Sequence, residues 1–228
     1  MEANFWHKCW ERNTLGFHQV EYHPLLERVV LPELLKDECS TKQHVGVWPN
    51  KRVLVPLSGK SDDMIWFAEY ANVVGSELSK IACQDFFKEK QLNIQPKRDG
   101  DFFVYRHENI SLWQGDFFSL TTDLVGEFDW IYDRAALIAL PETMQQSYVN
   151  QLKSFINPHT TLFLLTLEFP TDEMSGPPFP VDELRVSELF SDHSVTCLHA
   201  QTLPDKRFAQ RVFDVSHLVE KLYLITQS

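Results

Sequence analysis

The chain is poor in several features that define common classes of protein. It has only 8 glycines in 228 residues, and its four cysteines lie far apart with no C-x-x-C pair: Cys9, Cys39, Cys83 and Cys197. This spacing argues against a disulfide framework and a zinc knuckle, so we expect reduced thiols. No window approaches the roughly 18 apolar residues of a membrane span. The start, MEANFWHKCW, lacks the apolar stretch of a secretory signal, so we expect a cytoplasmic protein.

Positive charge is also scarce. The chain has 32 acidic and 21 basic residues, a formal net charge of -11. This excess repels a phosphate backbone and an anionic membrane surface, so we expect neither nucleic acid nor membrane as a partner. With 43% hydrophobic residues and no visible repeat or linker, the sequence predicts a single domain over residues 1–228, and we expect a monomer.

Two glycine-rich phosphate-binding motifs are missing. Gly59-Lys60-Ser61 matches the end of a P-loop, but that motif needs a glycine five positions before Gly59, where the chain has Leu54. The dinucleotide fingerprint G-x-G-x-x-G is absent too. The sequence therefore excludes a P-loop nucleotide triphosphatase and argues against a dinucleotide enzyme.

From Val53 onward, short apolar strands alternate with helix-like segments. Strands are predicted in VLVP, NVVGSEL, ISLWQ, FDWIYD and TTLFLLTLEF, and helices over 61–70, 79–91 and 142–155. The alternation predicts an α/β fold with a largely parallel sheet and helices on both faces. Residues 102–105 and 110–113 are predicted to form a hairpin or two adjacent strands.

The two ends of the chain carry different patterns. Trp6 and Trp10 share one face of a predicted N-terminal helix, and a second helix around Leu25–Leu34 is kinked or weakened by Pro32. Cys39 to Arg52 is predicted to be a surface loop. After SGPPFPV, a rigid loop, a helix is expected to be capped near Asp182. SVTCLHAQTL and LVEKLYLITQ then predict an antiparallel pair of strands, joined by the charged segment 204–214.

Four loops are predicted to meet at the carboxyl edge of the sheet, where open α/β sheets bind their ligands. Gly59 follows the first strand and would let the backbone approach a ligand, although it could equally be a turn glycine. Glu77 lies 18 positions later. A carboxylate there could accept both hydroxyls of an adenosine ribose, or it could be an acid stabilised by a helix dipole.

The other two loops extend the same pattern. Asp116 and Phe117 could contact an adenine ring, or could be a turn aspartate and a core aromatic. The charged pair Asp133-Arg134 implies either a ligand carboxylate or a structural salt bridge. An acid suited to ribose without a phosphate cradle favours S-adenosylmethionine over NAD or ATP.

Nearly the whole chain, from Phe5 to about Thr226, resembles the thiopurine S-methyltransferase family. The matching segments, in the family's order and spacing, are FWHKCW, GFHQVEYHPLL, VPLSGKSDDMIWFAE, VVGSELS, NISLWQGDFF, FDWIYDRAAL, GPPFPV and EKLYLIT. The resemblance implies a class I methyltransferase: a three-layer α/β sandwich whose mostly parallel, Rossmann-like sheet has seven strands, with an antiparallel C-terminal strand. Residues 1–38 would form a helical lid over a sheet core of 52–228.

The resemblance also implies site residues. S-adenosylmethionine binding falls on Trp6, Trp10, Leu57, Glu77, Asp116, Phe117 and Arg134, to which the loop after the first strand adds Gly59. Substrate contact falls on Phe17 and, in a loosely aligned segment, Arg207. Ser58 departs from the cysteine that the family commonly carries. No metal is expected, because His18 and His23, five apart, lack a usual chelating spacing.

The implied reaction is in-line transfer of the methyl group of S-adenosylmethionine to the sulfur of a thiopurine or another aromatic or heterocyclic thiol. A sulfonium methyl is already activated, so no catalytic base is required where the acceptor ionises. Two alternatives stay open: the same fold methylating a halide or a reduced selenium or tellurium species, and a non-catalytic S-adenosylmethionine-binding protein.

Overall fold

The computed structural model describes residues 3–36 and 48–228. Most of the predicted surface loop between Cys39 and Arg52, and the end of the expected lid, lie outside these residues. Within the described ranges, no helix combines the length and the apolar character needed to cross a membrane.

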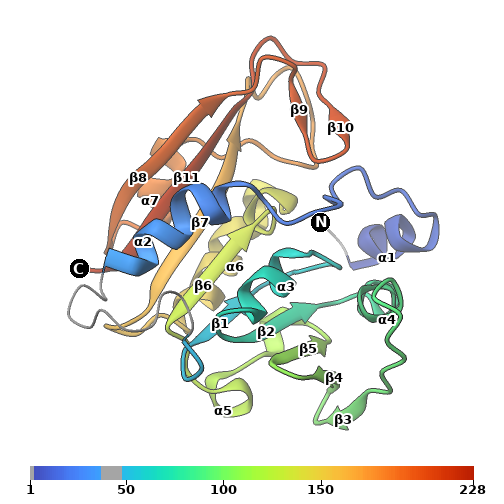
Figure 1. Cartoon of the computed structure of the whole chain (residues 1–228). Coiled ribbons are helices and arrows are strands. Elements are labelled where there is room, and N and C mark those ends of the chain that lie inside the picture. Colours follow the sequence, from blue (N-terminus) through green and yellow to red (C-terminus); the bar gives the residue numbers. More distant parts are fainter. Residues whose placement is uncertain (1–2, 37–47) are drawn as a thin grey trace.

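A mixed sheet forms the centre of the fold, as predicted (Figure 1). Its strands follow the order β3-β4-β5-β2-β1-β6-β7-β11-β8. Five neighbours in the middle run parallel: β1 (Arg52–Val55), β2 (Asn72–Glu77), β5 (Ile110–Gln114), β6 (Trp130–Arg134) and β7 (Thr161–Glu168). β1 pairs with β2 on one side and β6 on the other, so the strand order reverses at β1.

The antiparallel C-terminal pair is confirmed. β11 (Val219–Gln227) lies between β7 and β8 (His193–Thr202) and runs antiparallel to both. The segment 204–214 between them contains two strands that the sequence did not predict, β9 (Arg207–Phe208) and β10 (Arg211–Val212), which form a separate antiparallel hairpin. The hairpin lies beyond one end of the long C-terminal strands (Figure 1).

Within the described residues the sheet has nine strands, where the resemblance implied seven. The hairpin predicted over 102–113 is present as β4 (Phe102–His107) and β5, and it brings a further edge strand, β3 (Lys97–Asp99), which pairs with β4. All three residues of β3 are exposed. They therefore carry no alternation of apolar and polar residues from which a strand could be predicted.

Helices cover both faces of the sheet, which gives the three layers expected. In Figure 1, α2 (Leu31–Lys36) and α3 (Asp63–Ala68) lie in front of the strands, and α6 (Glu142–Lys153) and α7 (Glu183–Leu189) lie behind them. Asp182 caps α7 as predicted, accepting a hydrogen bond from the Arg185 N–H. The remaining helical elements are α4 (Lys80–Lys88), α5 (Thr122–Val125), η2 (Phe117–Ser119) and η3 (Leu137–Ala139).

The N-terminal segment contains the two predicted helices. α1 (Ala3–Glu11) carries Trp6 and Trp10 and contacts α4. The second helix changes geometry along its length, from a π-helical turn over Leu26–Val30 to α2. Pro32 explains the change, because it has no N–H to donate to the carbonyl four residues earlier and its ring crowds that carbonyl.

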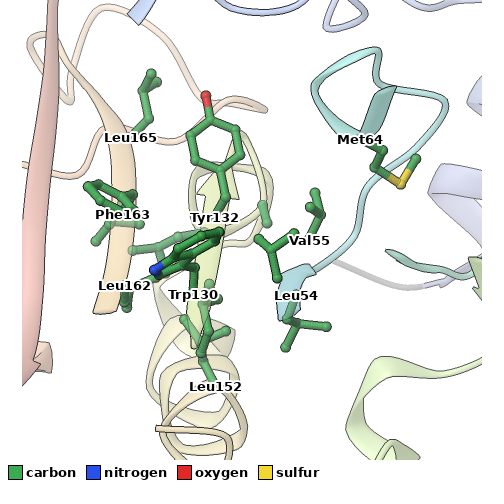
Figure 2. Packing of buried hydrophobic residues seen from close by; sticks show 14 of the residues in the cluster. Leu54, Val55, Met64, Trp130, Tyr132, Leu152, Leu162, Phe163 and Leu165 are labelled. Atoms are coloured by element: carbon green, nitrogen blue, oxygen red, sulfur yellow. The ribbon is translucent and has the colours of Figure 1, made fainter. Parts of the chain in front are cut away.

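The core lies where the central strands meet the helices. Figure 2 shows side chains of β1, β6 and β7 packed with Leu152 of α6 and Met64 of α3. Leu54, Leu152 and Leu162 have no exposed surface. Because this packing fixes the strands rigidly, it also fixes the positions of the loops at their carboxyl ends.

Candidate functional site

One cavity of about 930 Å³ lies at the carboxyl ends of β1, β2, β5 and β6. The loops after all four strands line it together with the N-terminal segment. Nine of the ten predicted site residues are among its lining residues: Trp6, Trp10, Phe17, Leu57, Gly59, Glu77, Asp116, Phe117 and Arg134. The tenth, Arg207, is exposed on β9 and does not line the cavity.

The loop after β1 turns sharply at the cavity. Leu57 and Gly59 both have positive φ angles, 46° and 57°. A side chain on Gly59 would also approach Trp10, since its Cβ would lie 3.3 Å from Trp10 Cζ2. Glycine is therefore required here for its backbone conformation and for space. Ser58 leaves the turn intact, and its N–H donates to the Ser76 carbonyl at 2.8 Å.

Glu77 ties the loop after β1 to the end of β2. Its Oε2 accepts a hydrogen bond from the Gly59 N–H at 2.9 Å, and its Oε1 accepts one from the Ser79 N–H at 2.6 Å. Burial raises the pKa of this carboxyl to about 7, against the lowering effect of these backbone donors. A carboxylate has about four acceptor positions, so each oxygen can take a further donor from a ligand.

Arg134 is paired, but not with its neighbour Asp133. Its Nε donates to Asp63 Oδ2 and its Nη2 donates to Ser61 Oγ. The Arg134 and Asp63 side chains are only 6% and 1% exposed, so this is a buried ion pair. Nη1 has no hydrogen-bond partner in the described part of the chain, which leaves its N–H groups, at one edge of the guanidinium, for a ligand.

Asp133 has a separate, structural environment. It is fully buried and accepts hydrogen bonds from the Tyr148 hydroxyl at 2.8 Å and from the Ala136 N–H at 3.2 Å. Burial raises its pKa to about 6. Consecutive residues of a strand point to opposite faces, so the two charges in Asp133-Arg134 lie in different layers. Asp133 therefore has a structural role. Arg134 forms a salt bridge, with Asp63 as its partner.

Asp63 also fixes the N-terminal segment. Its Oδ1 accepts a hydrogen bond from the His23 N–H at 2.8 Å. The imidazole of His23 in turn lies between two partners, with Nδ1 accepting from the Leu25 N–H at 3.2 Å and Nε2 3.0 Å from Glu220 Oε1. The backbone donor on Nδ1 assigns the proton to Nε2, which donates to Glu220. One carboxylate therefore links Arg134 at the cavity to the segment that follows α1.

Asp116 and Phe117 have the structural roles that the sequence allowed, a turn aspartate and a core aromatic. Asp116 Oδ1 accepts a hydrogen bond from the Phe118 N–H at 3.0 Å, as a turn aspartate does. The Phe117 ring is 2% exposed and packs at centroid distances of 5.5 Å from Tyr148 and 6.0 Å from Phe155. Both residues nevertheless line the cavity.

Aromatic rings of the N-terminal segment form one wall. Phe17 meets Trp6 and Trp10 edge to face, at centroid distances of 5.4 Å and 5.7 Å. Trp10 is 5% exposed, and its ring lies against Gly59. Edge-to-face contacts of this kind stabilise a defined arrangement. The segment that was expected to act as a lid thus contributes directly to the cavity.

The far end of the cavity holds residues that the sequence did not single out. Arg211, rather than Arg207, lines it, with its Nη1 donating to the Pro177 carbonyl at 2.7 Å and its guanidinium 5.1 Å from the centre of the Phe213 ring. The β9–β10 turn uses Ala209 at positive φ instead of glycine, so no turn signal marked it. Cys9, His18 and Lys60 also line the cavity.

Across the described ranges, no group of three or more His, Cys, Asp or Glu side chains is arranged to hold a metal ion. Cys9, Cys83 and Cys197 are free thiols, half-buried, buried and exposed respectively, and Cys39 lies outside the described residues.

The fold defines a class of protein. A SAM-dependent methyltransferase from Anabaena variabilis ATCC 29413 superposes with a TM-score of 0.63 at 15% identity, covering 99% of this chain and 95% of the other. Magnesium protoporphyrin IX methyltransferase from Synechocystis PCC 6803, solved with bound SAH, gives 0.60 at 13% identity, covering 99% and 97%. The chain has the class I methyltransferase fold.

Sequence comparison gives the family. The model of the family Thiopurine S-methyltransferase (TPMT) matches residues 1–228. The thiopurine S-methyltransferase of Pseudomonas fluorescens (strain Pf0-1) is 41% identical over 227 residues, covering 99% of both chains, and that of Vibrio campbellii (strain ATCC BAA-1116) is 37% identical, covering 98% of both. The chain belongs to the thiopurine S-methyltransferase family.

Proposed function

We propose that this chain is an S-adenosylmethionine-dependent thiopurine S-methyltransferase that methylates the sulfur of thiopurines or of other aromatic and heterocyclic thiols. The observation that carries the proposal is the full-length family match, together with a single cavity lined by nine predicted site residues. We further propose that the chain acts as a monomer and a single domain in the cytoplasm, without a metal.

The co-substrate would occupy the part of the cavity lined by Glu77, Arg134 and Asp116. Glu77 would accept the ribose hydroxyls with the acceptor positions that its backbone donors leave free. Arg134 Nη1 would bind the carboxylate of the amino-acid moiety, and Asp116 and Phe117 would contact the adenine. Trp6 and Trp10 would cover the methyl donor from the lid side. When bound, S-adenosylmethionine supplies a methyl group on a positively charged sulfur, which needs no further activation.

The outer part of the cavity suits an aromatic acceptor. Phe17 and Phe213 supply apolar surface, and Arg211 supplies positive charge. Positive charge stabilises the thiolate form of an acceptor, which is the more nucleophilic form. An aliphatic thiol titrates near pKa ~8.5, and aromatic and heterocyclic thiols titrate lower. The protein's main task is therefore to align the sulfur with the methyl group and to exclude water.

A panel of acceptors tests this proposal. Purified protein is incubated with S-adenosylmethionine and thiopurines, thiophenols, iodide, selenide or telluride, and S-adenosylhomocysteine release is measured. We expect turnover with thiopurines and thiophenols to exceed that with the inorganic acceptors. Higher turnover with iodide, or with reduced selenium or tellurium, would show that the protein methylates one of these acceptors in preference to thiols. Calorimetric binding of S-adenosylhomocysteine without turnover on any acceptor would indicate a binding protein and contradict the proposal.

Nucleoside affinity should depend on pH through Glu77. Its pKa is about 7 in the free protein, and donors from ribose favour the ionised form, so binding lowers the pKa and releases a proton. Affinity then rises with pH up to about 7 and levels off above it. The ionised fraction goes from about one tenth at pH 6 to nine tenths at pH 8, so we expect affinity to fall by about tenfold from pH 8 to pH 6.

The measurement is calorimetry with 5′-methylthioadenosine, which keeps the ribose and the adenine but has no group that titrates in this range. Glu77→Gln is the matched control, because it removes the titration and keeps the shape of the side chain. We expect its weaker affinity to be flat between pH 6 and pH 8. An equally steep dependence in the Gln variant would assign the proton to another group.

A further inference from the structure

The cavity contains seven ionisable side chains, and six of them are unsuited to accepting a proton from an acceptor near neutral pH. The seven are Cys9, His18, Lys60, Glu77, Asp116, Arg134 and Arg211. Lys60 Nζ donates to Glu89 Oε1 at 2.5 Å, and both arginines are cations held by protein acceptors. Glu77 and Asp116 accept backbone N–H groups and are the proposed contacts of the ribose and the adenine, so both are assigned to the co-substrate rather than to the acceptor. Burial raises the pKa of the Cys9 thiol, so it holds its own proton.

His18 is the remaining group. It directly follows Phe17, whose ring is fixed against Trp6 and Trp10, and its own N–H donates to the Leu15 carbonyl at 2.9 Å. The backbone on the N-terminal side of the residue is therefore held in place. The imidazole is half-buried in the cavity wall, and within the described residues it has no side-chain hydrogen bond. A basic ring nitrogen is thus available to a bound acceptor.

The surroundings of His18 keep the imidazole neutral. Burial lowers its pKa first, and the charge of Lys60 lowers it further. Glu89 and Asp62 act in the opposite direction, and Arg134 again lowers the pKa. At neutral pH the ring therefore carries a free lone pair. The same two cations would stabilise the negative charge that develops on an acceptor sulfur as its proton leaves.

We propose that His18 is the general base that takes the proton of acceptor thiols that reach the cavity un-ionised. The inference rests on the proposed methyltransferase function. As the acceptor sulfur forms its bond to the methyl carbon, the bond from that carbon to the sulfonium breaks and its electron pair stays on the donor sulfur. The thiol proton moves to a ring nitrogen of His18, and the imidazolium passes it to water as the products leave.

The role makes the importance of His18 depend on the acceptor. A thiol that is already ionised in solution brings no proton and gains nothing from a base, whereas an un-ionised thiol needs one. General bases typically contribute about 10²–10⁴-fold. We expect the loss on removing His18 to be at least about tenfold for an un-ionised acceptor, because water can partly replace the base, and less than about twofold for an ionised one.

The test compares wild type, His18→Gln and His18→Ala with two acceptors. At pH 7, 4-nitrothiophenol is largely ionised and benzyl mercaptan is largely un-ionised. We expect both variants to lose at least about tenfold in kcat with benzyl mercaptan, to stay within about twofold with 4-nitrothiophenol, and to recover most of the loss as pH rises to 10. His199→Gln, on the exposed edge strand β8, controls for loss of a histidine. S-adenosylhomocysteine affinity of each variant checks that the site is intact.

The outcomes separate the two proposals. An equal loss with both acceptors would show that His18 only shapes the cavity, and no loss with either would show that it has no part in the reaction. Both results overturn the inference while leaving the methyltransferase assignment in place. If the wild type methylated neither thiol and no thiopurine either, the proposed function itself would fail.

Discussion

Asp63→Ala should lower the free energy of unfolding by about 3–5 kcal/mol, the usual effect of removing one partner of a buried ion pair. The change leaves the guanidinium of Arg134 buried without its carboxylate, since both side chains are almost fully covered. It also removes the acceptor of the His23 N–H, so the attachment of the N-terminal segment weakens at the same position. Urea unfolding, followed by tryptophan fluorescence, measures the loss.

The adjacent residue gives a matched control. Asp62 pairs with Lys90 at 2.6 Å, but these side chains are 32% and 25% exposed, so solvent already screens the pair. We expect Asp62→Ala to cost less than about 1 kcal/mol. If Asp62→Ala and Asp63→Ala had the same midpoint of urea unfolding, the Asp63–Arg134 pair would not hold the lid and the cavity together.

Glu77→Ala should weaken S-adenosylhomocysteine binding by at least about 100-fold. A hydrogen bond to a charged group contributes about 1.5–3 kcal/mol, and the two ribose hydroxyls would lose two such bonds. The variant also loses the acceptor of the Gly59 N–H, so the loop after β1 is no longer held toward the cavity. Calorimetry at pH 8, where the wild-type carboxyl is ionised, measures the full effect.

Two further variants test whether the loss of affinity comes from the carboxylate of Glu77. Glu77→Gln keeps the side chain's shape and one acceptor oxygen, so it should fall between wild type and the alanine variant. Glu108→Ala removes a carboxylate that is 79% exposed, and it should leave the affinity within about twofold of wild type. A Glu77→Ala protein that bound the nucleoside as tightly as Glu108→Ala would remove Glu77 from the binding site.

The features that the sequence predicted correctly depend on short-range patterns. The apolar runs of the central strands and the helices between them made the parallel sheet predictable, and strand–helix–strand geometry placed Glu77 at the same sheet edge as Gly59. Those two residues are now joined by a hydrogen bond. In the central sheet the local sequence pattern and the tertiary packing favour the same structure.

The features that the sequence left open depend on contacts between distant segments. Asp133 and Arg134 are neighbours in the chain, yet their partners are Tyr148 and Asp63, and only the strand's alternation separates them. β9 and β10 are two residues each and turn without glycine, so nothing marked Arg211 as a cavity residue. His18 was weighed only as a metal ligand, because its position in the cavity wall, without a side-chain hydrogen bond among the described residues, is visible only in three dimensions.

A crystal structure of the protein with S-adenosylhomocysteine and an aromatic thiol tests the central claim most directly. We predict that the nucleoside lies at the carboxyl ends of β1 and β2, with both ribose hydroxyls within hydrogen-bonding distance of Glu77. The acceptor sulfur should lie on the side of the donor sulfur that faces Phe17 and His18. A nucleoside bound outside this cavity, or a Glu77 side chain turned away from the ribose, would contradict the account.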